Sequence, residues 1–373
     1  MSSSLELLPR QDMDLTDRPK ILFAATSLEP GAGGIQRVAR LMARVLLDDF
    51  ADSASVSLLT LHDKGPAADI PAPVRFHGGS SLRMAYNTIR NRGSHLITDA
   101  CNLGQLHWLP GLRRKPYLTA LHGIEIWEAA KKRWVRSAKA ATIQMFVSDY
   151  SRRRAESIHG PFPRSCVCWL ATETDELPPA RPYAPDANDV IIVGRMFAER
   201  YKGHHELIAA WPTVVSMVPS ATLRIIGRGP GEGALKALAE QSGAARNIVF
   251  EGFVSEQRLD ELYARAAMFA MPSRGEGFGL VYIEAMRHGL PVIASRHDAA
   301  PEIVIDEVTG YTVDLDSPGQ LPDRIIRLLQ HRELAARLGE AGRRRWAEHF
   351  RYSCFRARYG EILRRFLQTR PIH

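Results

Sequence analysis

Cysteine is scarce in this chain, and no Cys-x-x-Cys pair occurs. The 373 residues contain only four: Cys101, Cys166, Cys168 and Cys354. Structural zinc sites and disulfide frameworks need several thiols at set spacings, so neither is expected to organise the fold. We therefore expect buried structural thiols and predict no bound metal.

Long apolar runs are also missing. No stretch reaches the roughly 20 apolar residues that cross a bilayer, and residues 1–18 lack the apolar centre of a signal peptide. The sequence therefore predicts a cytoplasmic protein. With 45% hydrophobic and 24% charged residues, the chain is long enough for two domains with sizeable cores.

Negative charge is depleted in part of the first half. The formal net charge is +8, and from Arg75 to Arg164 there are 16 Lys and Arg against five Asp and Glu. Basic clusters lie at residues 112–115, 127–139 and 152–154. The middle cluster includes two tryptophans, which suits an anionic membrane surface. An ordinary solvated helix face is the alternative.

Strand-like and helix-like segments alternate along the first half. Residues 20–26 form a short apolar run, a glycine loop follows, and apolar residues then recur at helical spacing from Ile35 to Val45. Further strand-like runs lie at residues 55–61, 95–98, 117–121 and 143–148. This alternation predicts a parallel, doubly wound α/β sheet.

A proline-rich stretch separates this alternation from a second one of the same kind. Four prolines between residues 178 and 185 mark a linker. Strand-like runs resume at residues 190–193, 222–226, 248–251, 268–271 and 291–294. We predict an N-terminal domain over 1–177, a linker over 178–188, a C-terminal domain over 189–350 and a final helix within 351–373. Because ligands bind beyond the carboxyl ends of parallel strands, two such domains predict a cleft between them.

Residues 275–284 join a glycine-rich turn to a helix start. Gly275, Gly277 and Gly279 let the backbone approach a ligand, and the first amides of the helix favour a diphosphate or sugar hydroxyls. Glu276 and Glu284 are placed to accept hydrogen bonds from polyols. The pattern predicts a sugar-nucleotide site, and a helix cap with two solvated glutamates is the alternative.

Two cations follow the first strand of the second alternation. Arg195 comes after residues 190–193 and Gly194, and Lys202 lies seven residues later, before a helix. A forked guanidinium and a compact ammonium suit diphosphate oxygens, so the pair is placed to stabilise a departing nucleoside diphosphate without a metal ion. Two surface bases near a turn are the alternative.

These motifs together resemble the retaining glycosyltransferases of family 4, whose fold is called GT-B. The resemblance rests on the Glu-x7-Glu spacing from Glu276 to Glu284 and on the Gly-Arg…Lys-Gly pattern over residues 194–203. It covers residues 194–313 well and the first half only at scattered points. It implies two Rossmann-like doubly wound α/β domains facing a central cleft, with the final helix packing back on the first domain.

The resemblance also implies roles for single residues. Glu276 positions the sugar, Glu284 holds the ribose, and Arg195 and Lys202 stabilise the diphosphate. His122 contacts the donor hexose, with a plain turn residue as the alternative. The further substrate-binding candidates are Gly33, Gly34, Gly277, Phe278, Gly279, Leu280, Arg228 and Val254. Glu302, in an Ala-Pro-Glu turn, is expected to cap a helix.

This resemblance implies transfer of a hexose from a nucleotide sugar with retention of configuration and with no cofactor. Similarity of residues 200–204 and 271–276 to bacterial polysaccharide mannosyl- and glucosyltransferases makes GDP-mannose the first choice of donor and UDP-glucose the second. We expect a saccharide or polyprenyl-diphosphate-linked acceptor in exopolysaccharide or lipopolysaccharide synthesis, met at the inner face of the cell membrane. A GT-B sugar-nucleotide epimerase and a basic nucleic-acid-binding protein are the alternatives. No reader motif for nucleic acid is present, so we expect no nucleic-acid partner.

Overall fold

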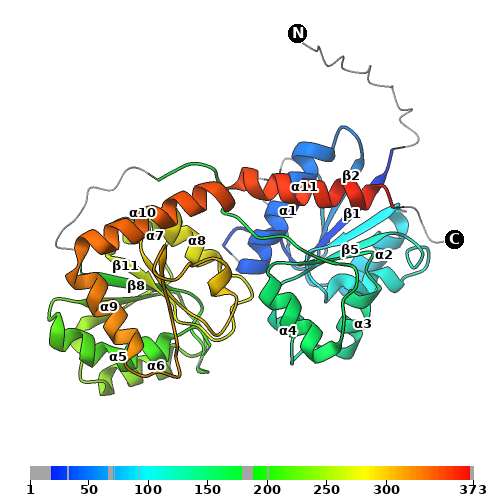
Figure 1. Cartoon of the computed structure of the whole chain (residues 1–373). Helices are drawn as coiled ribbons and strands as arrows, with labels where there is room; N and C mark the ends of the chain where they lie inside the picture. The colour runs from blue at the N-terminus through cyan, green and yellow to red at the C-terminus, as the bar shows by residue number, and fades with distance from the viewer. Residues whose placement is uncertain are drawn as a thin grey trace, which may run out of the picture.

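Two parallel β-sheets flanked by helices make up the protein (Figure 1). The computed structural model describes residues 18–31, 33–65, 70, 72–91, 93–178, 188–199 and 201–369. Within these ranges the first sheet has seven strands in the order β3-β2-β1-β4-β5-β6-β7, and the second has six in the order β10-β9-β8-β11-β12-β13. The predicted doubly wound α/β class is confirmed.

The first sheet is built from short, largely apolar runs. Its strands are β1 (Lys20–Ala25), β2 (Ser55–Thr60), β3 (Val74–Phe76), β4 (His95–Thr98), β5 (Tyr117–Leu121), β6 (Ile143–Phe146) and β7 (Ser165–Val167). The last five residues of central β1 are all buried, as expected where both faces of a sheet are covered. The edge strands β3 and β7 were not predicted, because three residues are too few to show a period.

Amphipathic helices cover this sheet. They are α1 (Gly34–Phe50), α2 (Ser81–Asn91), α3 (Lys132–Ala140) and α4 (Asp149–His159), with short 3₁₀ turns η1 (Leu103–Trp108) and η2 (Ile124–Ile126). In α1, Val38, Leu41, Met42 and Val45 are buried. Their spacing of three and four residues forms one apolar stripe, which turns α1 toward the sheet.

The second sheet repeats this plan. Its strands are β8 (Asp189–Val193), β9 (Thr222–Ile226), β10 (Ile248–Gly252), β11 (Met268–Ala270), β12 (Val292–Ser295) and β13 (Gly310–Val313). Its helical segments are α5 (His204–Met217), α6 (Glu232–Gln241), α7 (Glu256–Arg265), α8 (Leu280–Arg287), α9 (Gln320–Gln330), α10 (Arg332–His349) and the 3₁₀ turns η3 (Ala245–Asn247) and η4 (Ala300–Glu302).

The last helix, α11 (Tyr352–Leu367), continues from α10 and lies beside α1 of the first sheet (Figure 1). The hydroxyl of Tyr352 donates to Asp48 Oδ2 at 2.8 Å, and the Arg44 guanidinium lies 3.8 Å from the centroid of the Tyr352 ring. Phe355 is fully buried. The domain boundaries stay a prediction, and residues 179–187 of the predicted linker lie outside the described residues.

We predict that packing of α11, which lies beside α1, carries much of the stability. Phe355→Ala removes a side chain that is 0% exposed, so the free energy of unfolding should fall by about 3–5 kcal/mol. Leu82→Ala, at a position that is 85% exposed, should change it by less than about 0.5 kcal/mol. Urea unfolding followed by circular dichroism measures both, and equal effects would contradict the prediction.

Candidate active site

The loop from Gly275 to Gly279 presses directly against the first half of the chain. The carbonyl oxygen of Gly277 accepts hydrogen bonds from Ser148 Oγ at 2.6 Å and from Ser151 Oγ at 3.0 Å. A Cβ at Gly277 would lie 1.8 Å from the carbonyl oxygen of His122. Only glycine allows this approach. The sequence predicts that this backbone approaches a ligand, and in the structure the backbone of Gly277 contacts the first domain of the protein.

Glu276, in the middle of this loop, forms an ion pair with Lys202. The two side chains are only 12% and 20% exposed, so each neutralises a charge that would be costly to bury alone. The Lys202 side chain passes over Gly194 to reach the loop, and a Cβ added at Gly194 would lie 3.2 Å from Cδ of Lys202. The predicted pair of motifs therefore meets in space, with carboxylate and ammonium in contact.

Glu284, on α8, joins the two halves of the molecule. One carboxylate oxygen pairs with Arg37 from the first turns of α1, and the other accepts from the Tyr263 hydroxyl at 3.2 Å. The nearby Glu284 carboxylate raises the pKa of Arg37. Sequence reasoning missed Arg37, because a helix arginine gives no sign of a partner 247 positions away.

Arg195, Arg228 and Val254 follow the carboxyl ends of adjacent strands β8, β9 and β10. Backbone bonds tie these loops together: Met196 N donates to Arg228 O at 3.2 Å, and Gly227 N donates to Gly252 O at 2.8 Å. Both arginine side chains are exposed, whereas Val254 is half-buried against the core. The three predicted residues thus share one edge of the second sheet.

Gly33, Gly34 and His122 lie at the matching edge of the first sheet. Gly33 caps α1 and Gly34 begins it, and both are exposed. His122 follows β5, and its Nε2 lies 2.6 Å from the carbonyl oxygen of Asp99. Since the His122 carbonyl faces Gly277, His122 borders the Glu276 loop from the opposite domain.

Asp298 shapes the loop from beneath. Its Oδ2 accepts from Ser273 Oγ and from the Glu276 backbone amide, the latter at 3.0 Å, and its Oδ1 accepts from the Ala300 amide at 2.9 Å. Burial raises the pKa of this carboxyl to about 7. Asp298 therefore positions Glu276, a role that the sequence did not reveal.

Glu302 caps a helix, as predicted, but the helix belongs to the other half of the chain. Its carboxylate accepts from the backbone amides of Asp149 and Tyr150 at 3.0 and 2.6 Å, where α4 begins. It also accepts from Trp169 Nε1 at 3.1 Å. Negative charge is favourable at a helix N-terminus, so this contact helps hold the two domains together.

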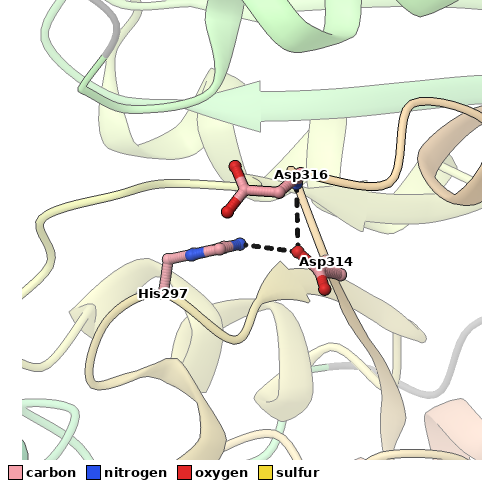
Figure 2. A group of neighbouring side chains, drawn as sticks. All are labelled: His297, Asp314 and Asp316. Atoms are coloured by element: carbon pink, nitrogen blue, oxygen red, sulfur yellow. Dashed lines mark hydrogen bonds and ion pairs between the residues drawn. The ribbon is translucent and has the colours of Figure 1, made fainter.

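A neighbouring group of side chains has the composition of a metal site but is satisfied by the protein. His297, Asp314 and Asp316 place ligand atoms within 4.8 Å of one another (Figure 2). His297 Nε2 already accepts from the Leu315 amide at 3.1 Å, and Asp316 pairs with Arg274 at 2.9 Å. These contacts fold the loop after β13, and we assign no metal to them.

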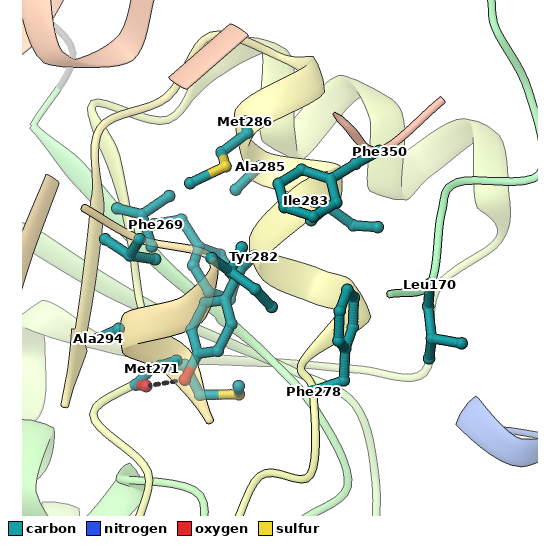
Figure 3. Packing of buried hydrophobic residues seen from close by; sticks show 14 of the residues in the cluster. Leu170, Phe269, Met271, Phe278, Tyr282, Ile283, Ala285, Met286, Ala294 and Phe350 are labelled. Atoms are coloured by element: carbon teal, nitrogen blue, oxygen red, sulfur yellow. Dashed lines mark hydrogen bonds between the residues drawn. The ribbon is translucent and has the colours of Figure 1, made fainter. Parts of the chain in front are cut away.

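Two predicted binding residues are placed less favourably. Phe278 is 3% exposed, and its ring packs 6.1 Å from that of Phe350 (Figure 3). Leu280 is half-buried against the same core. Gly279 has φ +92° and is the N-cap of α8. Binding of a ligand by this segment stays a prediction.

The sequence of this chain is similar to those of known glycosyl transferases. Residues 173–345 match the family profile described as glycosyl transferases group 1. The GDP-mannose-dependent alpha-(1-6)-phosphatidylinositol monomannoside mannosyltransferase of Mycobacterium tuberculosis is 31% identical over 267 residues, covering 66% of this chain and 69% of the relative. The enzyme of the same name from Mycolicibacterium smegmatis is 32% identical over 285 residues, covering 70% and 72%. The chain belongs to the group 1 glycosyl transferases. It is therefore a retaining hexosyltransferase of glycosyltransferase family 4.

Solved structures of other glycosyl transferases share the fold. Sucrose-phosphate synthase from Thermosynechococcus elongatus superposes with a TM-score of 0.76 at 22% identity, covering 93% of this chain and 99% of that one. Anabaena HepE in complex with UDP and glucose gives 0.75 at 19% identity, covering 93% and 100%. The predicted GT-B fold is confirmed. Among the described residues of this glycosyl transferase, none of the helices has the length and apolar character to cross a membrane.

We predict that Gly277 is required for the two domains to meet. Gly277→Ala places a Cβ 1.8 Å from the His122 carbonyl oxygen, so the loop must shift and the transfer rate should fall about 100-fold. Gly233→Ala, where nothing lies within 4 Å of the added carbon, is the matched control. Small-angle scattering should show wider separation of the domains in the first variant alone, and an active, compact Gly277→Ala protein would refute the prediction.

We predict that Asp298 makes stability depend on pH. The folded carboxyl keeps its proton up to a pKa of about 7, against 3.8 ordinarily, so the folded state binds more protons between these values. The free energy of unfolding contributed by this group therefore falls as pH rises from about 4 to about 7. Urea unfolding at pH 5 and pH 8 measures the free energy of unfolding of the wild type and of Asp298→Asn. The wild type should gain more stability relative to the variant at pH 5 than at pH 8. A constant difference would rule this out.

Proposed function

We propose that this glycosyl transferase moves mannose from GDP-mannose to a saccharide or polyprenyl-diphosphate-linked acceptor in bacterial exopolysaccharide or lipopolysaccharide synthesis. The observation that carries the donor half of the proposal is the contact of Glu276 with Lys202 beside the helix start at Gly279. A sugar hydroxyl can donate a hydrogen bond to the Glu276 carboxylate, and a diphosphate oxygen can accept one from the Lys202 ammonium.

The proposed mechanism uses the residues at the two sheet edges. Arg195, Lys202 and the backbone amides near Gly279 stabilise the departing diphosphate. Glu276 positions the sugar, and His122 contacts the hexose from the opposite domain. The diphosphate takes the proton of the attacking hydroxyl on the same face of the sugar, so configuration is retained without a glycosyl-enzyme intermediate.

Glu284 holds the ribose in this proposal. In the structure, Arg37 pairs with the same carboxylate. When the nucleotide binds, its ribose hydroxyls therefore take the place of Arg37 as hydrogen-bond donors to Glu284. Arg228 and Val254 lie at the same sheet edge as Arg195 and serve the phosphate and the base, respectively. Gly33 and Gly34 offer backbone contacts from the first domain.

The choice of GDP-mannose is supported by the relatives, whose names state that donor. Their names also state a phosphatidylinositol-linked acceptor, which agrees with an acceptor at a membrane surface. The exposed cations Lys131, Lys132 and Arg133 at the start of α3 are proposed to contact anionic headgroups at the inner face of the cell membrane. UDP-glucose is the second donor candidate.

We predict opposite kinetic signatures for the two glutamates. Glu276→Gln should lower kcat about 100-fold with little change in donor KM, because the sugar loses its alignment. Glu284→Gln should raise donor KM about tenfold with little change in kcat, because it weakens one hydrogen bond to ribose. Radiolabelled transfer from GDP-mannose and UDP-glucose to membrane extracts provides the measurement.

Exposed Glu240 on α6 supplies the control, since Glu240→Gln removes the same charge away from the site. Thermal unfolding with each nucleotide sugar should show the larger stabilisation by GDP-mannose. Stabilisation by UDP-glucose alone would replace the donor assignment. Epimerised nucleotide sugar after incubation with donor alone would overturn the transferase proposal.

A further inference from the structure

A pocket of about 190 Å³ lies between the two domains, beside the Glu276 loop. Trp127, Glu128 and Arg154 line it from the first domain, and Tyr201, Arg274 and Gly275 line it from the second. An apolar cavity of about 150 Å³ accommodates a benzene ring, so this pocket has room for one sugar ring.

The pocket borders the proposed reacting centre. Tyr201 and Gly275 each precede, by one position, the paired residues Lys202 and Glu276. The Tyr201 hydroxyl donates to the Gly275 carbonyl oxygen at 2.7 Å, which fixes this wall. A ring bound here therefore lies next to the transferred sugar while leaving the nucleotide-binding edge of β8, β9 and β10 open.

Two arginines face the pocket, each held by an exposed carboxylate. Arg154 Nε and Nη2 both donate to Glu128 Oε1, at 3.0 and 2.7 Å, and its guanidinium lies 4.4 Å from the centroid of the Trp127 ring. Glu128 is 60% exposed, so this ion pair is weak and exchangeable. A phosphate matches the same forked donor. Arg274, from the other domain, pairs with exposed Asp316.

A basic cluster follows the pocket residues along the chain. The α3 cluster, defined as Lys131, Lys132, Arg133 and Arg136, begins two residues after the pocket residue Ala129 and is exposed throughout. The first turn of α3 has no acidic residue. By contrast, Arg152 and Arg153 pair with Asp149 on their own helix. The α3 cluster therefore places four positive charges close in the chain to the pocket residue Ala129.

We propose that this pocket is the acceptor site and that the acceptor carries a phosphate or diphosphate next to its sugar ring. The ring occupies the space between Trp127 and Tyr201, and the phosphate replaces Glu128 on Arg154 and extends toward the α3 cluster. This inference rests on the proposed function, because it assumes that the adjoining Glu276 loop holds the transferred sugar. It narrows the acceptor from any saccharide to an anionic, phosphate-bearing one.

The test uses two ligands that differ only in the phosphate: octyl α-mannoside and octyl α-mannosyl phosphate, together with their glucose and galactose counterparts. Calorimetric titration of the full chain should show the phosphate form of at least one sugar binding about tenfold or more tightly than the neutral form. Salt between 50 and 300 mM should reduce that preference. Equal affinity of neutral and phosphate forms for every sugar would overturn the proposal.

Variants of two residues should act in opposite directions. Arg154→Gln should abolish the phosphate preference, whereas Glu128→Gln should increase phosphate affinity about two- to fivefold, because it removes the competing carboxylate. If the ion pair had only a structural role, both variants would bind the phosphate ligand more weakly than the wild type. Arg153→Gln, on the same helix but paired with Asp149, is the matched control and should keep the wild-type preference.

Two further measurements assign the outcome. Mannose 1-phosphate, which has no tail, distinguishes a free sugar phosphate from a lipid-linked one: similar affinity supports the first and much weaker affinity the second. Donor affinity, measured separately by thermal unfolding with GDP-mannose and UDP-glucose, should be unchanged in Arg154→Gln. A loss of donor affinity in Arg154→Gln would mean that the pocket binds the donor, and this would overturn the acceptor assignment. Phosphate-selective binding by a protein that binds no nucleotide sugar would contradict only the proposed function.

Discussion

The close contact of Gly277 with the first domain is the constraint on which the rest of the site depends. The carbonyl of His122 occupies the space that any larger residue would need, and two serines of α4 and its cap bind the Gly277 carbonyl. Because the backbones meet here, Glu276 and the start of α8 are held at the boundary between the sheets.

Charged side chains at this boundary form ion pairs. Glu276 holds Lys202, Glu284 holds Arg37, and Glu128 holds Arg154. An unpaired charge in a partly buried site costs several kcal/mol, so Glu276 and Glu284, each 12% exposed, are stabilised by their cationic partners. In the proposed reaction, ligand groups replace these partners one by one. Binding then exchanges hydrogen bonds instead of exposing bare charges.

Two further carboxylates organise the backbone instead of binding substrate. Asp298 accepts three hydrogen bonds beneath the Glu276 loop, and Glu302 caps α4 across the domain boundary. The first is deeply buried, which raises its pKa, whereas the second gains from the helix N-terminus. Together they make the position of Glu276 depend on residues from both sheets.

Local patterns in the sequence determined the alternation of strands and helices, the α/β class and the motifs around Arg195, Lys202, Glu276 and Glu284, because period, glycine spacing and charge are properties of neighbouring residues. The edge strands β3, β7 and β13 were not predicted, because each is short and combines apolar residues with a polar residue or glycine. Only the tertiary structure decided that Phe278 faces the core, that Asp298 orients the loop, and that Arg37 and Arg154 border the site. These depend on contacts between residues far apart in the chain, and such contacts are set by how two complete domains pack, which no local pattern records.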